Sequence, residues 1–232
     1  MKAVILAAGK GTRMQPLTLE KPKPLLEVLG KPILVHVLEC LPPEIKEIII
    51  VVGYMGDQIK THLGDDFGGR KIHYVEQKEL NGHIPALKLA RQYLRPGEKF
   101  LILPADDIRG KDDLTRLVSH PLAVGVHEVE HPERFGIVVP SAKGTIADIE
   151  EKPKEPKSNL AATMAYVLND SIFDYQEKMH GDGEYYLPPV IKQMARDKDI
   201  FIERETGWIP IGYPEDLKKA EAVLKDNAAG AK

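Results

Sequence analysis

The chain has 232 residues, of which 43% are hydrophobic and 29% charged, with 32 lysines and arginines against 35 aspartates and glutamates. A formal net charge of −3 gives no overall attraction for nucleic acid, so we expect no nucleic-acid partner and only a local positive site. The single cysteine, Cys40, excludes an intrachain disulfide and a cysteine-based metal cluster. It falls in an apolar helical stretch, which predicts a buried structural thiol.

The hydrophobic runs are short. No stretch approaches the ~20 consecutive apolar residues that a membrane span needs. The N-terminal run AVILAA is too short for a signal peptide and has no basic leader and no cleavage site. The sequence therefore predicts a cytoplasmic protein with no membrane partner.

The first ~120 residues alternate short β-branched runs with amphipathic segments. Strands are predicted for KAVILAA (2–8), EIIIVVG (47–53), KIHYVEQ (71–77) and KFLILPADD (99–107). Helices are predicted for KPILVHVLECL (31–41, with Pro32 in its first turn), GDQIKTHL (56–63) and PALKLARQYL (85–94). This alternation predicts a doubly wound α/β fold, with a mostly parallel, Rossmann-like sheet and helices on both faces.

Beyond about residue 121 the pattern changes. LAVGVHEVE (122–130), the stretch 135–153 and ATMAYVLND (162–170) resemble strands, with a hairpin signal at SAKG and no regular helix between them. We interpret them as a small β-rich extension of the same sheet, so that residues 1–232 form a single domain. The chain ends with a helix from residue 214 and a tail of small residues that is expected to fray.

The loop GKGTRM follows the first predicted strand. Backbone N–H groups around Gly9 and Gly11 can cradle a phosphate, although two glycines also fit a simple tight turn. The loop lacks the third glycine of a dinucleotide-binding fingerprint and the Lys-Ser/Thr of a Walker loop. Arg13 adds a planar fork that matches phosphate oxygens. Lys23, held between two prolines in KPKP, is either a positioned cation or a solvated loop lysine.

With these residues in view, the stretch LAAGKGTRMQPLTLEKPKPLLEVLGKPIL (6–34) resembles the signature of the sugar-phosphate nucleotidylyltransferases. The resemblance implies transfer of a nucleotidyl group from a nucleoside triphosphate to a sugar-1-phosphate, with Mg²⁺ and with release of pyrophosphate. It implies a nucleotide-binding part over about 1–120 and a sugar-phosphate-binding part over about 121–232. It implies nucleotide contacts from Leu6, Ala7, Ala8, Gly9, Gly11, Thr12, Arg13, Lys23, Gln77 and Gly82, and catalytic roles for Arg13, Lys23 and Asp106.

Two further segments extend the resemblance on the nucleotide side. In VEQKELNG, Gln77 and Gly82 have the spacing of the residues that read the base, although Gln77 alone also fits a polar strand end. The chain then continues HIPA where the family has T-A-x-A or T-G-H-A. In LILPADD, Asp106 takes the place of the magnesium-binding aspartate at a strand end, where α/β sheets bind ligands; a helix cap or a solvated acid is the alternative.

On the sugar side the resemblance is patchy. RFGIV and IEEKP place Gly136 against the sugar, Glu151 at its hydroxyls and Lys152 at its phosphate. Asn159 fits the asparagine before the next strand. Met164 stands where glycine is usual and either narrows the sugar pocket or fills the core.

The last motif departs from the pattern. In GWIPIGYPEDL, Trp208 aligns with the sugar-side tryptophan, but Pro210 replaces the second magnesium aspartate. Likewise, EYYLPPVI carries two prolines in place of Thr-Asp. Asp107, next to Asp106, points to the opposite face if the strand continues. Because Mg²⁺ is usually held by one or two carboxylates plus substrate phosphates, Asp106 alone can still bind it, more weakly.

Three functions stay open at this point. The first is a Mg²⁺-dependent sugar-1-phosphate nucleotidylyltransferase, whose base and sugar the sequence does not reveal. The second is transfer of a cytidylyl group to phosphocholine or a similar non-sugar phosphate. The third is a non-catalytic, nucleotide- or sugar-phosphate-binding regulatory homologue, which the missing aspartate favours and the retained Arg13 and Lys23 disfavour. The resemblance implies no additional acetyltransferase or regulatory domain, and it allows a homo-oligomer.

Overall fold

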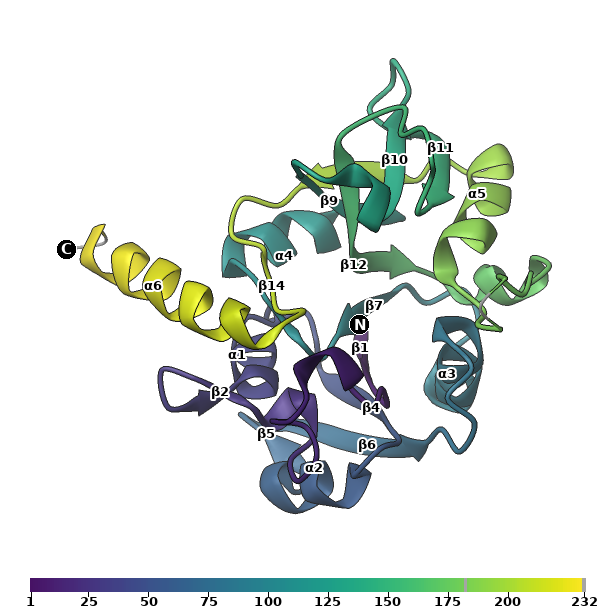
Figure 1. Ribbon diagram of the computed structural model, residues 1–232. Helices are drawn as coiled ribbons and strands as arrows, with labels where there is room; N and C mark the ends of the chain where they lie inside the picture. The colour runs from purple at the N-terminus through teal and green to yellow at the C-terminus, as the bar shows by residue number, and fades with distance from the viewer. Residues whose placement is uncertain (182, 231–232) are drawn as a thin grey trace.

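The computed structural model describes residues 1–181 and 183–230 and has a mixed ten-stranded sheet at its centre (Figure 1). The order along the sheet is β11-β10-β12-β7-β1-β4-β6-β5, with β9 paired to β12 and to β13. The strands of the first half that pair in parallel are β1 (Lys2–Ala7), β4 (Glu47–Val52), β6 (Arg70–Glu76) and β7 (Phe100–Pro104). The short strand β5 (Asp66–Phe67) closes this side in antiparallel register.

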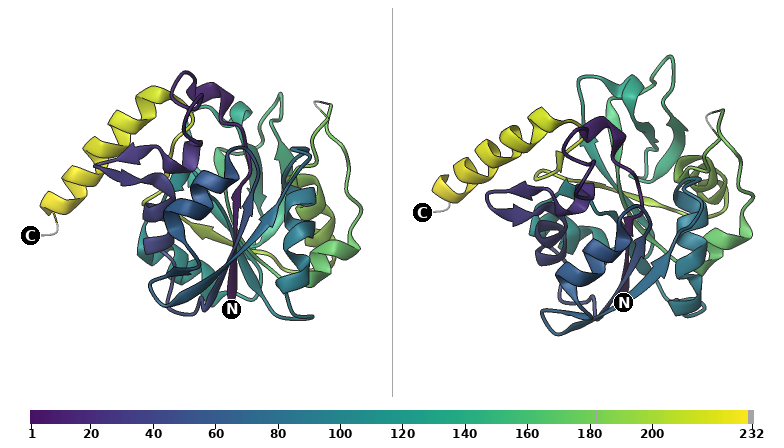
Figure 2. Two further views of the ribbon diagram at one scale, coloured as in Figure 1. Left: turned by 90° about the horizontal axis from the view of Figure 1, so that it is seen from below. Right: turned by 60° about the horizontal axis from the view of Figure 1, so that its bottom comes forward.

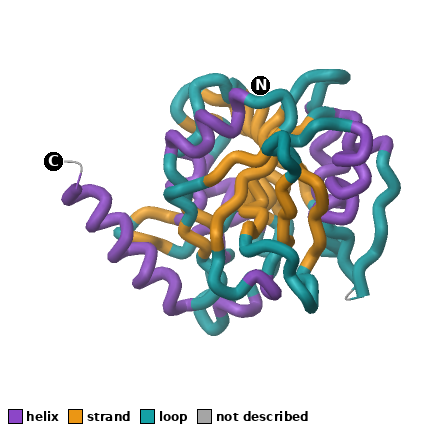
Figure 3. The backbone as a smooth tube through the Cα atoms, turned by 90° about the horizontal axis from the view of Figure 1, so that it is seen from above, coloured by secondary structure: helices purple, strands orange, loops and turns teal. Residues whose placement is uncertain are grey.

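The parallel strands are buried on both faces because helices cover each of them (Figures 2 and 3). One face carries α3 (His83–Ala90) and α5 (Leu187–Asp197). The other carries α1 (Ile33–Glu39), α2 (Gly56–Leu63) and α4 (Lys111–Ser119). Two apolar clusters result, one on each side of the sheet, which confirms the expected doubly wound α/β arrangement with a largely parallel core.

The second half of the chain extends this sheet on the β7 side. β12 (Leu160–Leu168) pairs with β7 in antiparallel register and also contacts β9 (Ala123–Glu128) and β10 (Gly136–Pro140). β11 (Ile146–Glu151) forms a hairpin with β10, and β13 (Phe201–Arg204) runs parallel to β9. The predicted extension of the same sheet is thus present, and no α-helix interrupts residues 123–168.

A third apolar cluster lies outside the main sheet, beneath the C-terminal helix α6 (Pro214–Gly230), which projects from the body in Figure 1. It is built on the hairpin of β2 (Glu27–Val28) and β3 (Lys31–Pro32) and on the pair formed by β8 (Asp107–Ile108) and β14 (Ile209–Pro210). This cluster brings the segment after β14 back to the carboxyl end of β1.

Several details differ from the sequence-based expectations. The helices α4 and α5 were not predicted, although Leu187, Val190, Ile191 and Met194 follow helical spacing and are buried. The first helix is shorter than 31–41, with Pro32 as its N-cap residue. The final helix continues to Gly230, and the last two residues of the expected frayed tail lie outside the described residues.

Cys40 is half-buried rather than buried. Its Sγ donates a hydrogen bond to the backbone carbonyl of Arg109 at 3.0 Å, and burial raises the pKa of the thiol. These contacts agree with a structural thiol. Among the described residues, no helix combines the length and apolar character needed to cross a membrane.

Candidate functional site

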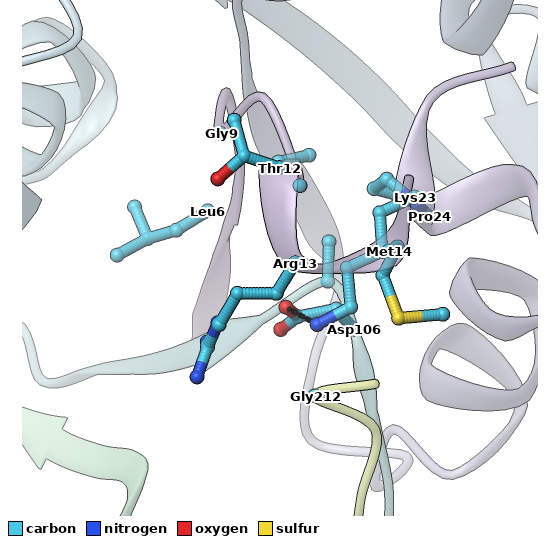
Figure 4. Close-up of a pocket in the computed structure, with 12 residues that line it drawn as sticks. Leu6, Gly9, Thr12, Arg13, Met14, Lys23, Pro24, Asp106 and Gly212 are labelled. Atoms are coloured by element: carbon cyan, nitrogen blue, oxygen red, sulfur yellow. Dashed lines mark hydrogen bonds and ion pairs between the residues drawn. The ribbon is translucent and has the colours of Figure 1, made fainter. Parts of the chain in front are cut away.

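A pocket of about 250 Å³ opens at the carboxyl end of β1, where the loop 8–11 leaves the sheet (Figure 4). Carboxyl ends of parallel strands are the usual ligand-binding edge of an α/β sheet. The lining comes from the loop, the KPKP segment, the end of β7 and the chain after β14: Leu6, Ala7, Gly9, Gly11, Thr12, Arg13, Met14, Lys23, Pro24, Ala105, Asp106 and Gly212.

The loop and the proline-flanked lysine pack directly against each other. Gly11 has a φ of +62°, and a Cβ added there would lie 3.0 Å from the Cβ of Lys23 and 3.2 Å from Cγ2 of Thr18. The hydroxyl of Thr18, which is buried, donates a hydrogen bond to the carbonyl of Gly11 at 2.9 Å. Glycine is therefore required at position 11 both by the left-handed backbone and by the approach of Lys23. The two motifs form a single site.

Lys23 is held in this pocket as a buried cation. It begins a 3₁₀ turn over Lys23–Leu25, and its side chain is 9% exposed. Its Nζ lies 2.5 Å from Oδ2 of Asp106, two residues after the end of β7 (Figure 4). A lysine that is this buried needs an anionic partner. The carboxylate of Asp106 supplies one in this state, and a phosphate group could replace it.

Arg13 lies on the other side of the pocket from Lys23 (Figure 4). It belongs to the 3₁₀ turn Thr12–Met14, and its guanidinium lies 5.5 Å from the centre of the Tyr213 ring. Tyr213 is held in turn because the Asp216 carboxylate accepts hydrogen bonds from the N–H groups of Gly212 and Tyr213, both at 2.9 Å. The start of α6 thus supports the arginine.

Asp107 serves as an anchor for β14. Its Oδ2 accepts a hydrogen bond from Nε1 of Trp208 at 3.0 Å, and the Arg109 guanidinium lies 3.7 Å from the same oxygen. Burial, and then the neighbouring Asp106 charge, raise the pKa of Asp107 to about 6. In the β8–β14 ladder Pro210 stands opposite Asp107. The backbone at this position is in place, but Pro210 contributes no carboxylate.

Gln77 and Gly82 lie beside the pocket rather than in its lining. The Gln77 side chain is 6% exposed, and its Nε2 donates to the carbonyl of Gly82 at 3.2 Å. Gly82 has a φ of +109°, and a Cβ there would lie 2.5 Å from the carbonyl oxygen of Tyr185. The same loop approaches the segment that follows β1, since a Cβ on Gly53 would lie 2.9 Å from both the Leu80 side chain and the Cβ of Ala8.

The predicted sugar-phosphate residues divide into two groups. Gly136 and Glu151 stand opposite each other in the β10–β11 ladder, and a Cβ on Gly136 would lie 3.0 Å from Oε2 of Glu151. Lys152, with a φ of +45°, places its Nζ 3.6 Å from the Glu151 carboxylate and 5.1 Å from the centre of the Tyr186 ring. These three predicted residues therefore come together at one end of β11.

The other two predicted sugar-side residues, Asn159 and Trp208, are bound to other parts of the protein. Asn159 is exposed at the start of β12, where its carbonyl accepts a hydrogen bond from the N–H of Val129 at 3.0 Å. Trp208 is 8% exposed and packs its ring near His127 and Phe135. The indole N–H donates to Asp107, and Trp208 neighbours the first group only through Phe135, whose carbonyl accepts the N–H of Lys152 at 3.0 Å.

His83 lies near enough to both Asp106 and Lys152 for their charges to act on its imidazole. It was not among the site residues predicted from the sequence. It begins α3, directly after Gly82, and its ring lies 5.4 Å from that of Tyr186. Burial lowers the pKa of His83 to about 4, the Asp106 charge opposes this shift and the Lys152 charge adds to it. The Nδ1 atom is buried without a hydrogen-bond partner in the described protein. The HIPA departure was the available sequence signal.

Other lining residues absent from the sequence-based set are Met14, Pro24, Ala105 and Gly212. Each of the four either stands next to a predicted residue in the chain or belongs to a matched motif. Their positions in the sequence could therefore have indicated that they line the pocket. Ala8, by contrast, was predicted to contact nucleotide but lies behind the pocket. It is 7% exposed, and its carbonyl accepts the N–H of Tyr54 at 3.0 Å.

The donor set around Asp106 fits a magnesium ion only together with phosphate oxygens. No group of three or more His, Cys, Asp or Glu side chains suited to a metal occurs within residues 1–181 and 183–230. Mg²⁺ keeps several waters and commonly takes one or two carboxylates plus substrate phosphates. Asp106, whose side chain is 34% exposed at the pocket, can be that carboxylate.

Residues 2–227 match the profile of the family described as nucleotidyl transferase. The UTP–glucose-1-phosphate uridylyltransferase AglF of Haloferax volcanii is 36% identical, with all of this chain and 99% of that protein covered. The bifunctional protein GlmU of Methanocaldococcus jannaschii is 35% identical over 97% of this chain. That alignment covers 55% of GlmU, so the chain spans about half the length of such bifunctional relatives.

Two solved structures resemble the whole chain. A glucose-1-phosphate thymidylyltransferase from Bacillus anthracis, by its description, superposes with a TM-score of 0.84 at 28% identity, covering 97% of this chain and 96% of that one. A UDP-glucose pyrophosphorylase bound to UDP-glucose superposes with a TM-score of 0.87 at 22% identity, covering 97% and 98%, and supports the fold alone. The resemblance and the fold class predicted from the sequence are both confirmed.

Proposed function

Because the chain belongs to the nucleotidyl transferase family, we propose that it transfers a nucleotidyl group from a nucleoside triphosphate to a sugar-1-phosphate. The observation that carries the proposal is the convergence of Arg13, Lys23 and Asp106 on one pocket at the carboxyl end of β1. Two cations and one carboxylate around a glycine loop suit a triphosphate and its counter-ion.

In this reaction a phosphate oxygen of the acceptor forms a bond to the α-phosphorus while the bond to the β-phosphate oxygen breaks. Pyrophosphate leaves with the electron pair of that bond. Such a displacement needs alignment and neutralisation of charge more than covalent help. We assign Lys23 and Arg13 to the phosphate oxygens on opposite sides of the pocket, and the N–H groups of the loop 8–11 to the remainder of the nucleotide.

Mg²⁺, when bound, supplies further neutralisation of the triphosphate charge, and Asp106 is the residue that would hold it. Lys23 contacts Asp106 in the ligand-free protein at 2.5 Å. When a nucleotide enters, its phosphates offer Lys23 a new partner and leave Asp106 available to a cation. Each of the two side chains thus has a partner of opposite charge in both states, and no buried charge is left alone.

On the acceptor side we propose that Glu151 binds hydroxyl groups and that Lys152 binds the phosphate. Glu151 is half-buried beside Gly136, while Lys152 is exposed and rests near the Tyr186 ring. The first residue is thereby fixed within the strand hairpin, whereas the side chain of the second is exposed to solvent. A fixed carboxylate suits recognition of the sugar ring through its hydroxyl groups, and an exposed ammonium suits an incoming phosphate.

The experiment is pyrophosphate release with Mg²⁺ across a grid of nucleoside triphosphates and phosphate acceptors, with phosphocholine among the acceptors. Lys23→Ala should reduce turnover by about 10³-fold, because a preorganised charge at the transferring phosphate is lost. Lys21→Ala is the matched control, since Lys21 lies in the same KPKP segment but is exposed and paired with Glu27 at 2.8 Å. Equal loss in both variants would show that the segment, and not the ammonium of Lys23, matters.

A second function is favoured by Pro210, which leaves Asp106 as the one acid in the pocket lining. A chain with a weakened metal site could bind nucleotide or sugar phosphate and act as a regulatory homologue. Nucleotide binding that depends on Lys23, without pyrophosphate release for any pair in the grid, would establish this alternative. Productive turnover with phosphocholine alone would instead assign a cytidylyltransferase of a non-sugar phosphate.

A further inference from the structure

Met164 occupies a strained backbone position within a strand. Its φ is +62°, a left-handed conformation that costs a residue with a Cβ roughly 1–2 kcal/mol relative to glycine. The register of β12 with β9 shifts between Ala162 and Tyr166, so Met164 lies in a bulge. Strain of this kind persists where the surroundings fix the backbone, and it is concentrated at functional sites.

The neighbouring Thr163 shows what fixes the bulge. Its carbonyl accepts a short hydrogen bond from Nη2 of Arg109, and its hydroxyl donates to Oε1 of Glu205 at 2.7 Å. The Arg109 and Glu205 side chains are 1% and 0% exposed and lie 3.5 Å apart. Gly125 makes room for this carboxylate, because a Cβ there would lie 1.9 Å from Glu205 Oε1. A buried ion pair therefore holds the segment on which Met164 sits.

The sheet register places Met164 between the two halves of the proposed site. Tyr166 stands opposite Ile102 on β7, so Met164, two residues earlier on the antiparallel β12, lies beyond the last of these pairs, in the direction of the β7 end at Pro104. Pro104 is the partner of Leu6, which lines the nucleotide pocket. On its other side, β12 pairs with β10, the strand that begins at Gly136 opposite Glu151.

The Met164 side chain lies on the same face of the sheet as Leu6. Met164 and Leu6 are both partly buried and pack against the same apolar cluster, which includes residues of α3 and α5. His83 begins α3 and Tyr186 precedes α5, so this face carries the residues around Lys152. Met164 therefore lies on the face of the sheet that carries Leu6 and the helices next to His83 and Tyr186.

From this placement we propose that Met164 is a specificity-determining residue that restricts the acceptor to a phosphate ester with a compact group. The inference rests on the proposed function, because it takes Glu151 and Lys152 as the acceptor site. A flexible four-atom side chain on the floor of that site leaves room for an unsubstituted sugar ring and excludes a bulky substituent such as an N-acetyl group. Glycine at this position would leave the space open and would remove the strain.

The test compares wild type, Met164→Gly and Met164→Ala for binding and turnover of a pentose-1-phosphate, a hexose-1-phosphate and an N-acetylhexosamine-1-phosphate. We expect Met164→Gly to bind the N-acetylated acceptor about tenfold more tightly or better, with little change for the pentose. Its melting temperature should be equal to or above that of wild type, because glycine adopts positive φ without cost. Leu29→Gly is the control, since Leu29 also has a positive φ of +54° but is 43% exposed in the β2–β3 turn.

The possible results separate the two proposals. Gained binding of the N-acetylated acceptor without turnover in any protein supports the role of Met164 and overturns the proposed enzyme function. Turnover with an acceptor profile that is the same in wild type and Met164→Gly overturns the role of Met164 and supports the function. Absence of binding for all acceptors overturns both. If Met164→Gly does not fold, Met164→Ala decides, because it removes the side chain beyond Cβ and keeps the backbone strain.

Discussion

The proposed nucleotide side and the proposed acceptor side of this molecule are built in different ways. On the nucleotide side, one segment of the chain from Leu6 to Pro24 supplies most of the pocket, and β7 adds Asp106. On the acceptor side, the residues come from separate elements, namely Gly136 of β10, Glu151 of β11 and the bulge of β12. The first site depends on local packing, whereas the second depends on how several strands are aligned.

The departures from the family pattern follow this difference. The loop, Arg13 and Lys23 are retained, while the residues that differ, such as His83, Met164 and Pro210, lie at the border between the two sides or beyond it. A site formed by one compact segment does not tolerate change at single positions, because each residue touches its neighbours. A site assembled from separate strands can accept a substitution in one of them, with a different ligand as the result.

The largest effect is expected from breaking the nucleotide side at Gly11. Gly11→Ala places a Cβ 3.0 Å from the Cβ of Lys23 on a backbone with a φ of +62°. We expect the free energy of unfolding to fall by about 2 kcal/mol, from backbone strain and from displacement of Lys23. Gly9→Ala is the control, since nothing lies within 4 Å of a Cβ there, and it should change the stability by less than ~0.5 kcal/mol. Urea unfolding measures both, and equal losses would contradict the proposed packing.

A smaller effect is expected from restoring a carboxylate at the border of the acceptor side. Ile209 and Ile211 pack into the apolar cluster under α6, so Pro210 takes the other side of the strand, as does the pocket residue Gly212. Pro210→Asp should therefore lower the Mg²⁺ concentration needed for half-maximal turnover by about tenfold, because a second carboxylate joins Asp106. Titration of pyrophosphate release with Mg²⁺ measures this.

The matched control for this exchange is Pro140→Asp, at an exposed position at the end of β10. This variant also replaces a proline with an aspartate, but at a position away from the pocket. It should leave the Mg²⁺ dependence of turnover unchanged. An unchanged Mg²⁺ requirement in Pro210→Asp would show that the side chain at this position does not reach the metal, and the loss of the aspartate would then be without consequence.

The smallest effect concerns His83, at the border of the two sides. Its pKa of about 4 in the folded chain is below the ordinary value of 6.5, so the unfolded chain takes up the proton first as the pH falls. Stability should therefore decrease between about pH 6.5 and pH 4 and level off below. Because the ring is only partly buried, we expect a difference of about 1 kcal/mol between wild type and His83→Gln over this range.

Urea unfolding at several pH values measures this contribution, and His131→Gln is the control because the His131 side chain is 62% exposed. Contributions from buried acids such as Glu205 cancel in the comparison, since every variant retains them. A pH dependence in His83→Gln that is identical to that of wild type would mean that water reaches the buried Nδ1 atom and that the imidazole protonates normally.

Much of the nucleotide side could be predicted from the sequence because its signals are local. Short sequence motifs contain Gly11, the proline-flanked Lys23 and Asp106 at the strand end. The alternation of apolar runs with amphipathic segments predicts the parallel sheet. Gly11, Lys23 and Asp106 line one pocket, while their role as a nucleotide site stays a prediction. The helix α5 was missed because two prolines in its first turn obscured a helical apolar pattern that starts at Leu187.

The acceptor side could be predicted only in part because its distances depend on strand register. Glu151 and Lys152 are adjacent in the chain, so they were found together with Gly136 through a motif. Asn159 directly precedes the strand that carries Met164, and it is exposed there. Trp208 matches the pattern, yet its indole N–H is used by Asp107. No local signal in the sequence distinguishes these outcomes.

The contact of 2.5 Å between Lys23 and Asp106 also determines how the two ligands of the pocket depend on each other. A nucleotide that arrives without a cation draws Lys23 away and leaves the carboxylate facing the phosphates, while a cation that arrives alone displaces the ammonium from its partner. Each event by itself separates an ion pair, whereas the two together exchange partners without loss. Under the proposed function, nucleotide and cation are therefore thermodynamically linked, and each should raise the affinity of the protein for the other by the same factor.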